Sequence, residues 1–210
     1  MDYIKQFIEH YPSLENIVPD IKSAFDILAG SFSKGRKLLI AGNGGSAADA
    51  EHITGELMKS FLKKRKLPDS FIADIGKVDS EIAQYLVSFL QPGLPVIPLS
   101  SHTSLNTACI NDINGNIIFA QQVYGYGKEG DVLLGISTSG NSKSVLYAAA
   151  VAKAKKIKVI ALTGNNGGKL KNFADVLINV PEIETWKIQE LHLPIYHLLC
   201  MMLEDCFFNE

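Results

Sequence analysis

Short, uniformly apolar runs that alternate with helical patterns constrain the fold of this chain more than any other feature. Four such runs occupy residues 37–42, 131–137, 158–164 and 175–180, and a fifth is predicted at residues 95–100. Runs this short and this apolar suit strands that are buried on both faces, as in a parallel sheet. Because helical patterns separate them, the sequence predicts an α/β fold in which a parallel sheet of about five strands is flanked by helices.

The segments between the runs supply the predicted helices. Residues 46–61 and 142–156 each carry a helical pattern, and residues 3–35 predict one or two N-terminal helices. The apolar stripe of this N-terminal segment consists of Ile17, Ile21, Phe25 and Leu28. The chain shows no long repeat and no low-complexity tract, so we expect a single domain over residues 1–210.

Residues 62–94 form a distinct block between the predicted strands. Its first part, residues 62–70, is basic and loop-like, whereas residues 79–90 predict a helix. One face of that helix carries Ile82, Leu86, Phe89 and Leu90.

Composition excludes several classes of protein. Of 210 residues, 47% are hydrophobic and 20% charged, and the formal net charge is −2, which favours a globular protein over a nucleic-acid or membrane-surface binder. The longest apolar stretch, residues 191–203, is too short to span a bilayer, and no signal-peptide pattern opens the chain. We expect a cytoplasmic protein whose three cysteines, Cys109, Cys200 and Cys206, are reduced and buried.

Two loops follow predicted strands and precede predicted helices, which is where anions bind. Residues 42–46, Gly-Asn-Gly-Gly-Ser, let the backbone approach a ligand at a helix N-terminus. An ordinary strand–helix turn with a Ser46 cap explains this loop equally well. Residues 137–142 carry four hydroxyls, more than capping needs. Because neither loop contains Lys or Arg, the pair favours a small phosphate monoester over a nucleoside triphosphate.

Two helical segments carry groups that could do chemistry. His52 and Glu56 are four residues apart and share one helix face beyond the first loop. Near the C-terminus lie Gln189, Glu190, His192 and His197. Taken alone, each set is better explained as part of an exposed helix surface, because such surfaces often carry His, Gln and Glu. As ligands, two histidines and a carboxylate would suit zinc with a position left open for substrate.

Several ordered blocks together resemble the phosphoheptose isomerases, single-domain members of the SIS (sugar isomerase) group. The blocks are GNGGSAADAEH with a following Glu56, IND, EGDVLLGISTSGNS, KVIALTGNNGGKL, ADV and IQELH with a following His197. The resemblance covers residues 16–205 and implies an SIS-type three-layer α/β sandwich. It implies a homotetramer that interconverts sedoheptulose 7-phosphate and D-glycero-D-manno-heptose 7-phosphate through an enediol, for lipopolysaccharide or other surface glycans.

The same resemblance implies roles for individual residues. Glu56 is the implied base on carbon and His197 the implied acid at oxygen. The implied zinc ligands are His52, Glu56, Gln189 and His197. The implied sugar-phosphate contacts are Asn43, Gly44, Gly45, Glu56, Asn111, Asp112, Ser137, Thr138, Ser139, Ser142 and Gln189. The family's sites lie at subunit contacts, so one site is expected to draw on more than one chain.

The chain departs from the family pattern in ways that bear on its substrate. Residues 62–94 are roughly two dozen residues longer than the same loop in shorter members, Lys59-Ser60 stands where the family has an arginine, and Trp186-Lys187 precedes the IQE block. Pro194 interrupts the last helical pattern. Two alternatives therefore remain: a non-catalytic SIS tetramer that binds a protein or senses a sugar phosphate, and an isomerase or lyase of another sugar phosphate. His52, Glu56, Gln189 and His197 favour the enzyme.

Overall fold

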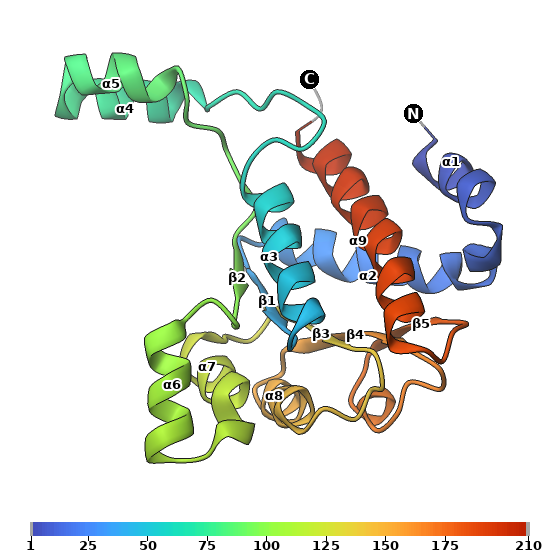
Figure 1. The fold of residues 1–210 in the computed structure, drawn as a ribbon. Helices are drawn as coiled ribbons and strands as arrows, with labels where there is room; N and C mark the ends of the chain where they lie inside the picture. The colour runs from blue at the N-terminus through green and yellow to red at the C-terminus, as the bar shows by residue number, and fades with distance from the viewer. Residues whose placement is uncertain (1, 209–210) are drawn as a thin grey trace.

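The predicted parallel sheet is present in the computed structural model, which describes residues 2–208. All strand pairs in it are parallel, and the strand order is β2-β1-β3-β4-β5 (Figure 1). The strands are β1 (Leu38–Ala41), β2 (Val96–Pro98), β3 (Val132–Ser137), β4 (Lys158–Gly164) and β5 (Val176–Val180). Each lies within or on one of the five apolar runs, which confirms the α/β fold class.

Helices cover both faces of the sheet and complete three layers (Figure 1). One layer contains α1 (Tyr3–His10), α2 (Val18–Phe32), α3 (Gly45–Met58) and α9 (Thr185–Phe207). The opposite layer contains α7 (Ile118–Tyr126) and α8 (Lys143–Ala154), with α6 (Thr103–Asp112) beside α7. Short 3₁₀ turns lie at η1 (Pro12–Ile17), η2 (Gly115–Ile117) and η3 (Leu170–Asn172). No helix within residues 2–208 is long and apolar enough to cross a membrane.

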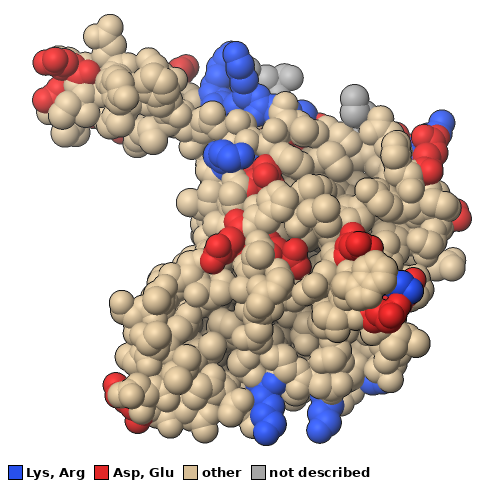
Figure 2. Space-filling view, viewed as in Figure 1, with Lys and Arg blue, Asp and Glu red and all other residues tan. Residues whose placement is uncertain are grey.

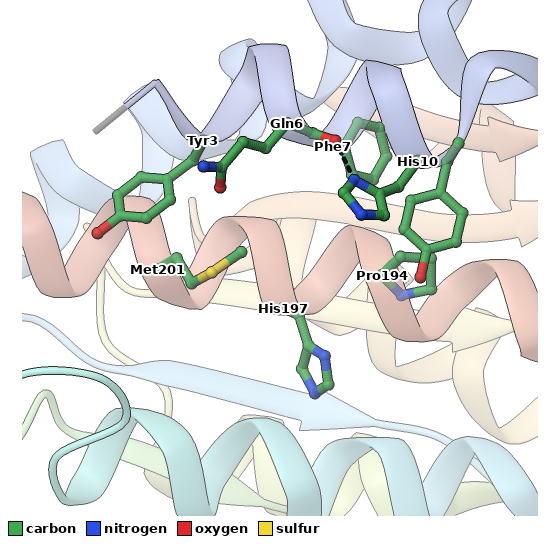
Figure 3. A pocket seen from close by; sticks show the side chains of 8 residues that line it. Tyr3, Gln6, Phe7, His10, Pro194, His197 and Met201 are labelled. Atoms are coloured by element: carbon green, nitrogen blue, oxygen red, sulfur yellow. Dashed lines mark hydrogen bonds between the residues drawn. The ribbon is translucent and has the colours of Figure 1, made fainter.

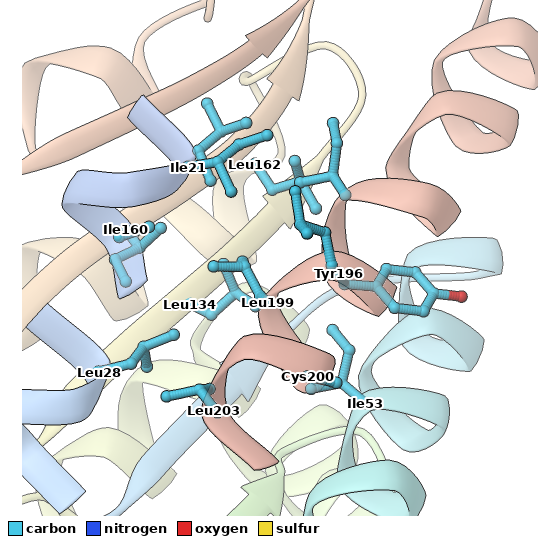
Figure 4. Packing of buried hydrophobic residues seen from close by; sticks show 14 of the residues in the cluster. Ile21, Leu28, Ile53, Leu134, Ile160, Leu162, Tyr196, Leu199, Cys200 and Leu203 are labelled. Atoms are coloured by element: carbon cyan, nitrogen blue, oxygen red, sulfur yellow. The ribbon is translucent and has the colours of Figure 1, made fainter. Parts of the chain in front are cut away.

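The strands divide their side chains between two hydrophobic cores, one on each face of the sheet. In β1, Leu38 and Ile40 belong to the core under α2, α3 and α9, whereas Leu39 and Ala41 belong to the core under α7 and α8. This division follows from the two-residue period of a strand. Figure 4 shows the larger core, in which side chains of α2 and α9 meet those of β3 and β4.

The last helix differs from its sequence pattern in two respects. Pro194 lies inside α9, which continues through it without a break. Cys206, near the end of α9, is exposed, so the expectation that all three cysteines are buried was wrong for this one; Cys109 and Cys200 are buried as expected. Near the middle of α9, His192 is fully buried.

The block at residues 62–94 is more helical than its sequence indicates. It holds two helices, α4 (Asp69–Val78) and α5 (Ser80–Val87), which pack against each other and extend away from the body of the molecule (Figure 1). The predicted helix at residues 79–90 is confirmed as α5. The loop-like interpretation of residues 62–70 is wrong at its end, because α4 begins at Asp69.

A buried ion pair fixes the root of this helical hairpin. Both nitrogens Nε and Nη2 of Arg65 lie 3.0 Å from Oε1 of Glu204 on α9, and both side chains are buried. Glu204 also accepts hydrogen bonds from the N–H groups of Phe61 and Leu62. Burial alone would raise the pKa of Glu204, but these N–H groups and the Arg65 guanidinium lower it below its ordinary value. The carboxylate is therefore held in its charged form.

His192 gives the first prediction, a loss of stability in mild acid. Burial lowers its pKa from 6.5 to about 4, and the neighbouring Thr163 backbone counteracts this only in part. Between these values the unfolded chain binds the proton and the folded chain does not, so stability is complete above pH 6.5 and falls toward pH 4. The loss is about 3 kcal/mol.

Urea unfolding between pH 4 and 7.5 measures this dependence. His192→Asn should flatten the slope over that window, whereas His10→Asn, at an exposed position of α1, should leave it unchanged. An unaltered slope in the His192 variant would contradict the assignment.

The Arg65–Glu204 pair gives the second prediction. Glu204→Gln leaves a buried guanidinium without its counter-charge and should destabilise the protein by about 3–5 kcal/mol, measured by urea unfolding at pH 7. The matched control is Asp74→Asn, which removes the exposed Lys77–Asp74 pair on α4 and should cost less than about 1 kcal/mol. Equal effects of the two substitutions would show that the buried pair does not fix the root.

Candidate active site

The first predicted anion loop joins β1 to α3. Gly44 has a φ of 55°, a left-handed conformation that favours glycine, and α3 begins at the next residue. Gly45 lies against α9 so closely that a Cβ there would collide with the side-chain amide of Gln189. The two glycines therefore let the chain turn sharply and bring the N-terminus of α3 against Gln189.

The second loop follows β3, the strand next to β1 in the sheet. The side-chain amide of Asn43 in the first loop donates to the hydroxyls of Ser142 and Ser144, at 2.9 and 3.0 Å. Asn141 holds the second loop from within, because its amide donates to the carbonyl of Ser139. The two loops are thus joined by side-chain hydrogen bonds at the carboxyl edge of the sheet, where parallel sheets bind ligands.

The loops and the start of α9 enclose a cleft of about 350 Å³. Its lining residues are Asn43, Gly44, Gly45, Ser46, Ile136, Ser137, Thr138, Ser139, Ser142, Thr185 and Gln189. The structure therefore brings together eight of the eleven positions that the sequence assigns to sugar-phosphate contacts. Asn111 and Asp112, at the end of α6, and Glu56 are not among the residues that line it.

A second group of side chains lies between α3 and α9, further along both helices. Nε2 of His52 is 3.4 Å from Oε1 of Glu56 and 3.4 Å from Nε2 of His197. Burial and the neighbouring His52 lower the pKa of His197, and Glu56 opposes them. The Oε2 atom of Glu56 is buried without a hydrogen bond and lies 3.5 Å from Nζ of Lys59. The predicted acid, His197, the predicted base, Glu56, and the predicted ligand His52 therefore lie together.

Two further residues of this group escaped the sequence analysis. The hydroxyl of Tyr196 lies 3.1 Å from Nδ1 of His52 and 3.4 Å from Oδ1 of Asp49. Burial raises the pKa of Asp49 to about 6, with Tyr196 and His52 opposing it. Asp49 lies one helical turn before His52, so its spacing could have indicated it. Tyr196, in contrast, lies between an isoleucine and a histidine in an apolar run with nothing to mark it.

The imidazole of His197 points toward α3 and away from α1 (Figure 3). On the α1 side of the same helix is a separate pocket of about 260 Å³, lined mainly by Tyr3, Gln6, Phe7, His10 and Tyr11. Although His197 contributes to its wall, the polar end of the ring belongs to the group with His52 and Glu56.

The same group of side chains was predicted to hold a metal ion. Within residues 2–208, no group of three or more His, Cys, Asp or Glu side chains is spaced to hold a metal ion. The donor chemistry nevertheless suits zinc, since two imidazoles and a carboxylate approach in pairs at 3.4 Å and one carboxylate oxygen has no hydrogen bond. Gln189, the fourth predicted ligand, lies beside Gly45 at the start of the two helices.

Comparison with known proteins places this geometry in context. The model of the SIS domain family matches residues 2–88 and 83–164. A phosphoheptose isomerase from a Nitratiruptor species is 37% identical, over 97% of this chain and 97% of its own length. One from Burkholderia pseudomallei is 38% identical, over 93% of this chain and 86% of its own length.

Solved structures of phosphoheptose isomerases superpose on the chain. The phosphoheptose isomerase of Neisseria gonorrhoeae has a TM-score of 0.75 at 33% identity, covering 96% of this chain and 94% of its own. The phosphoheptose isomerase of Francisella tularensis has a TM-score of 0.74 at 30% identity, covering 97% and 95%. The sequence and the fold of this chain thus match those of phosphoheptose isomerases over nearly its whole length.

The contact between Gly45 and Gln189 gives the third prediction. Gly45→Ala places a methyl group against the Gln189 amide and inside the cleft, so the affinity for inorganic phosphate should fall at least about 10-fold. Titration calorimetry measures the change. Gly55→Ala on the same helix, where a Cβ meets nothing within 4 Å, should bind phosphate as the wild type does and be slightly more stable. Unchanged affinity in the Gly45 variant would show that phosphate binds elsewhere.

Proposed function

The chain belongs to the phosphoheptose isomerase family of SIS-domain proteins, and from this membership we propose that it interconverts sedoheptulose 7-phosphate and D-glycero-D-manno-heptose 7-phosphate. The observation that carries the proposal is the placement of an anion cleft and an acid–base group along one pair of helices. Gly45 and Gln189 mark the cleft, and Glu56 and His197 lie further along α3 and α9.

The spacing of these two parts suits a long sugar phosphate. Glu56 lies eleven positions beyond Gly45 on α3, a rise of roughly 16 Å. Because helical side chains lean toward the N-terminus, the Glu56 carboxylate lies closer to the cleft than its Cα does. A substrate with its phosphate in the cleft would reach Glu56 with its opposite end.

The chemistry assigned to this end is proton transfer between C1 and C2. Glu56 removes the proton from carbon, and His197 supplies a proton to the neighbouring oxygen, which together give an enediol. The lowered pKa of His197 keeps its imidazole neutral near neutral pH, so the proton would come from the ring N–H. The nearby Tyr196 hydroxyl holds the other histidine, His52, in place.

We include zinc in the proposal on the strength of the donor chemistry. His52, Glu56 and His197 lie together and would hold the ion, which when bound would polarise the substrate carbonyl. The fourth predicted ligand, Gln189, lies beside Gly45 in the cleft, so its part in the site stays a prediction. Metal coordination and proton abstraction both fall on Glu56, so this residue has either role or alternates between them.

The proposal extends to the assembly and the cellular role. We infer a homotetramer in which Asn111 and Asp112, which do not line the cleft of their own chain, reach the site of another copy. We place the enzyme in the cytoplasm, where its product would enter the synthesis of lipopolysaccharide or another heptose-containing surface glycan.

The fourth prediction tests the proposed reaction directly. The purified protein, incubated with sedoheptulose 7-phosphate in D2O with and without added zinc, should form the aldose and incorporate deuterium at C2, followed by NMR. Glu56→Gln should slow the exchange at least about 100-fold, because the base on carbon is lost. Glu51→Gln, which alters an exposed acid on the same helix, should leave the rate unchanged.

The possible outcomes separate the proposed function from its alternatives. Neither aldose nor deuterium uptake with this substrate, under either metal condition, would contradict the proposed function. Exchange with a shorter sugar phosphate alone would favour an isomerase of another sugar. A Glu56 variant with full activity would disprove the role of Glu56 and leave the family assignment intact.

A further inference from the structure

The hairpin of α4 and α5 is stabilised by a thin internal seam. Ile72 and Ile75 of α4 and Leu86 of α5 are partly buried, and Ala83 is buried. The two residues on each helix are three positions apart, the spacing of one helix face, so they identify the side on which each helix meets the other. The side chains beside this seam are left for other contacts.

A second apolar face runs along the hairpin next to the seam. On α4 it includes Phe71 and Val78, which are 42% and 84% exposed. On α5 and the turn after it are Ile82, Tyr85 and Phe89, each more than half exposed, with the Tyr85 and Phe89 rings 4.9 Å apart.

Helical geometry places both sets on one face of the hairpin. Phe71 and Val78 are rotated about 100° from the seam of α4 in one sense, and Ile82 and Phe89 are rotated from the seam of α5 in the same sense. Two antiparallel helices are related by a twofold axis. Side chains that are displaced from the seam in the same sense on both helices therefore lie on the same face of the hairpin. The two sets therefore lie side by side.

The exposed area approaches the size that a specific protein interface requires. The five side chains leave on the order of 600 Å² of apolar surface, at roughly 200 Å² for each fully exposed side chain. A stable interface buries about 800 Å² on each partner. Two copies of this face would bury each other's apolar side chains, whereas a monomer seldom leaves an apolar patch of this size exposed to solvent.

Charge along the hairpin identifies the partner. Its outer end carries Asp79 and Glu81, and its root carries the exposed Lys64, whereas Lys63 and Arg65 beside it pair with Asp205 and Glu204 of the same chain. Figure 2 shows acidic side chains at the outer end of the hairpin and basic ones at its base. One hairpin is therefore complementary to a second that lies antiparallel to it, because each acidic end then meets a basic root.

We propose that this face of the α4–α5 hairpin is a self-association surface on which a second copy of the chain packs antiparallel. The interface is isologous, with the same residues on both sides. Because the hairpin extends away from the body, an antiparallel arrangement keeps these two bodies at opposite ends, so this contact is distinct from the one through which Asn111 and Asp112 would reach another copy. The surface is separate from the catalytic group, so the proposal does not depend on the isomerase activity.

Cross-linking tests the proposal and is the fifth prediction. In an antiparallel pair, Tyr85, midway along the face, lies near the twofold axis and opposite its own copy. Tyr85→Cys in a Cys206→Ser background should give a covalent dimer with a short bismaleimide, whereas Gln84→Cys, exposed on the other side of α5, should not. Adding Ile82→Glu and Phe89→Glu to the Tyr85→Cys protein should abolish the dimer, and Ala73→Glu on the polar face of α4 should not.

Charge reversal is a second test of the same surface. Glu81→Lys and Lys64→Glu should each reduce the cross-linked fraction severalfold, and the double variant should restore it, because each acidic end again faces an opposite charge. Circular dichroism checks that every variant is folded. Equal cross-linking of the Tyr85→Cys and Gln84→Cys proteins, or no cross-linking of either, would overturn the proposal. A double variant whose cross-linked fraction stays as low as that of the single variants would also overturn the proposal.

Discussion

The buried pair of Arg65 and Glu204 sets the relation between α3 and α9, and the rest of the site depends on that relation. The two helices run side by side in the same direction: Gly45 meets Gln189, His52 meets His197, and Phe61 beyond the end of α3 donates to Glu204. Arg65 also donates to the carbonyls of Glu56 and Leu57, which closes the C-terminus of α3. A slip of one helix along the other would separate these contacts together, so the acid–base group and the cleft share one register.

The sheet and its loops act as the second constraint. β1 and β3 are neighbours, so their carboxyl ends bring the two loops together without help from distant segments. The Asn43 amide then donates to the hydroxyl of Ser142 in the other loop and to that of Ser144 at the start of α8. Since hydroxyls and amides remain uncharged over the physiological range, the cleft is polar but carries no fixed charge of its own. A phosphate bound there would rely on hydrogen bonds and on the positive end of the α3 dipole.

The sequence was most informative where local patterns decide the structure. The apolar runs predicted all five strands, and the four-residue spacing of His52 and Glu56 predicted their shared face, because both signals depend on neighbours in sequence. Long-range partners leave no such signal. Arg65 lies in a basic run that is typical of a solvated loop, yet its partner Glu204 is 139 residues away. Tyr196 joins His52 and Asp49 from a helix 144 or more residues later, and only the packing of α9 against α3 reveals it.

The same ion pair explains how the chain accommodates a helical hairpin beside its site. Arg65 belongs to one stem of the hairpin, and its guanidinium also bonds to the carbonyl of Pro92 in the other stem. Both stems are therefore fixed to the end of α3 before the hairpin begins, and the exposed apolar face starts only at Phe71. Contacts made on that face act on helices that lie beyond a fixed root. The register of α3 and α9 is thus protected from them, and the hairpin can bind a partner without displacing Glu56 or His197.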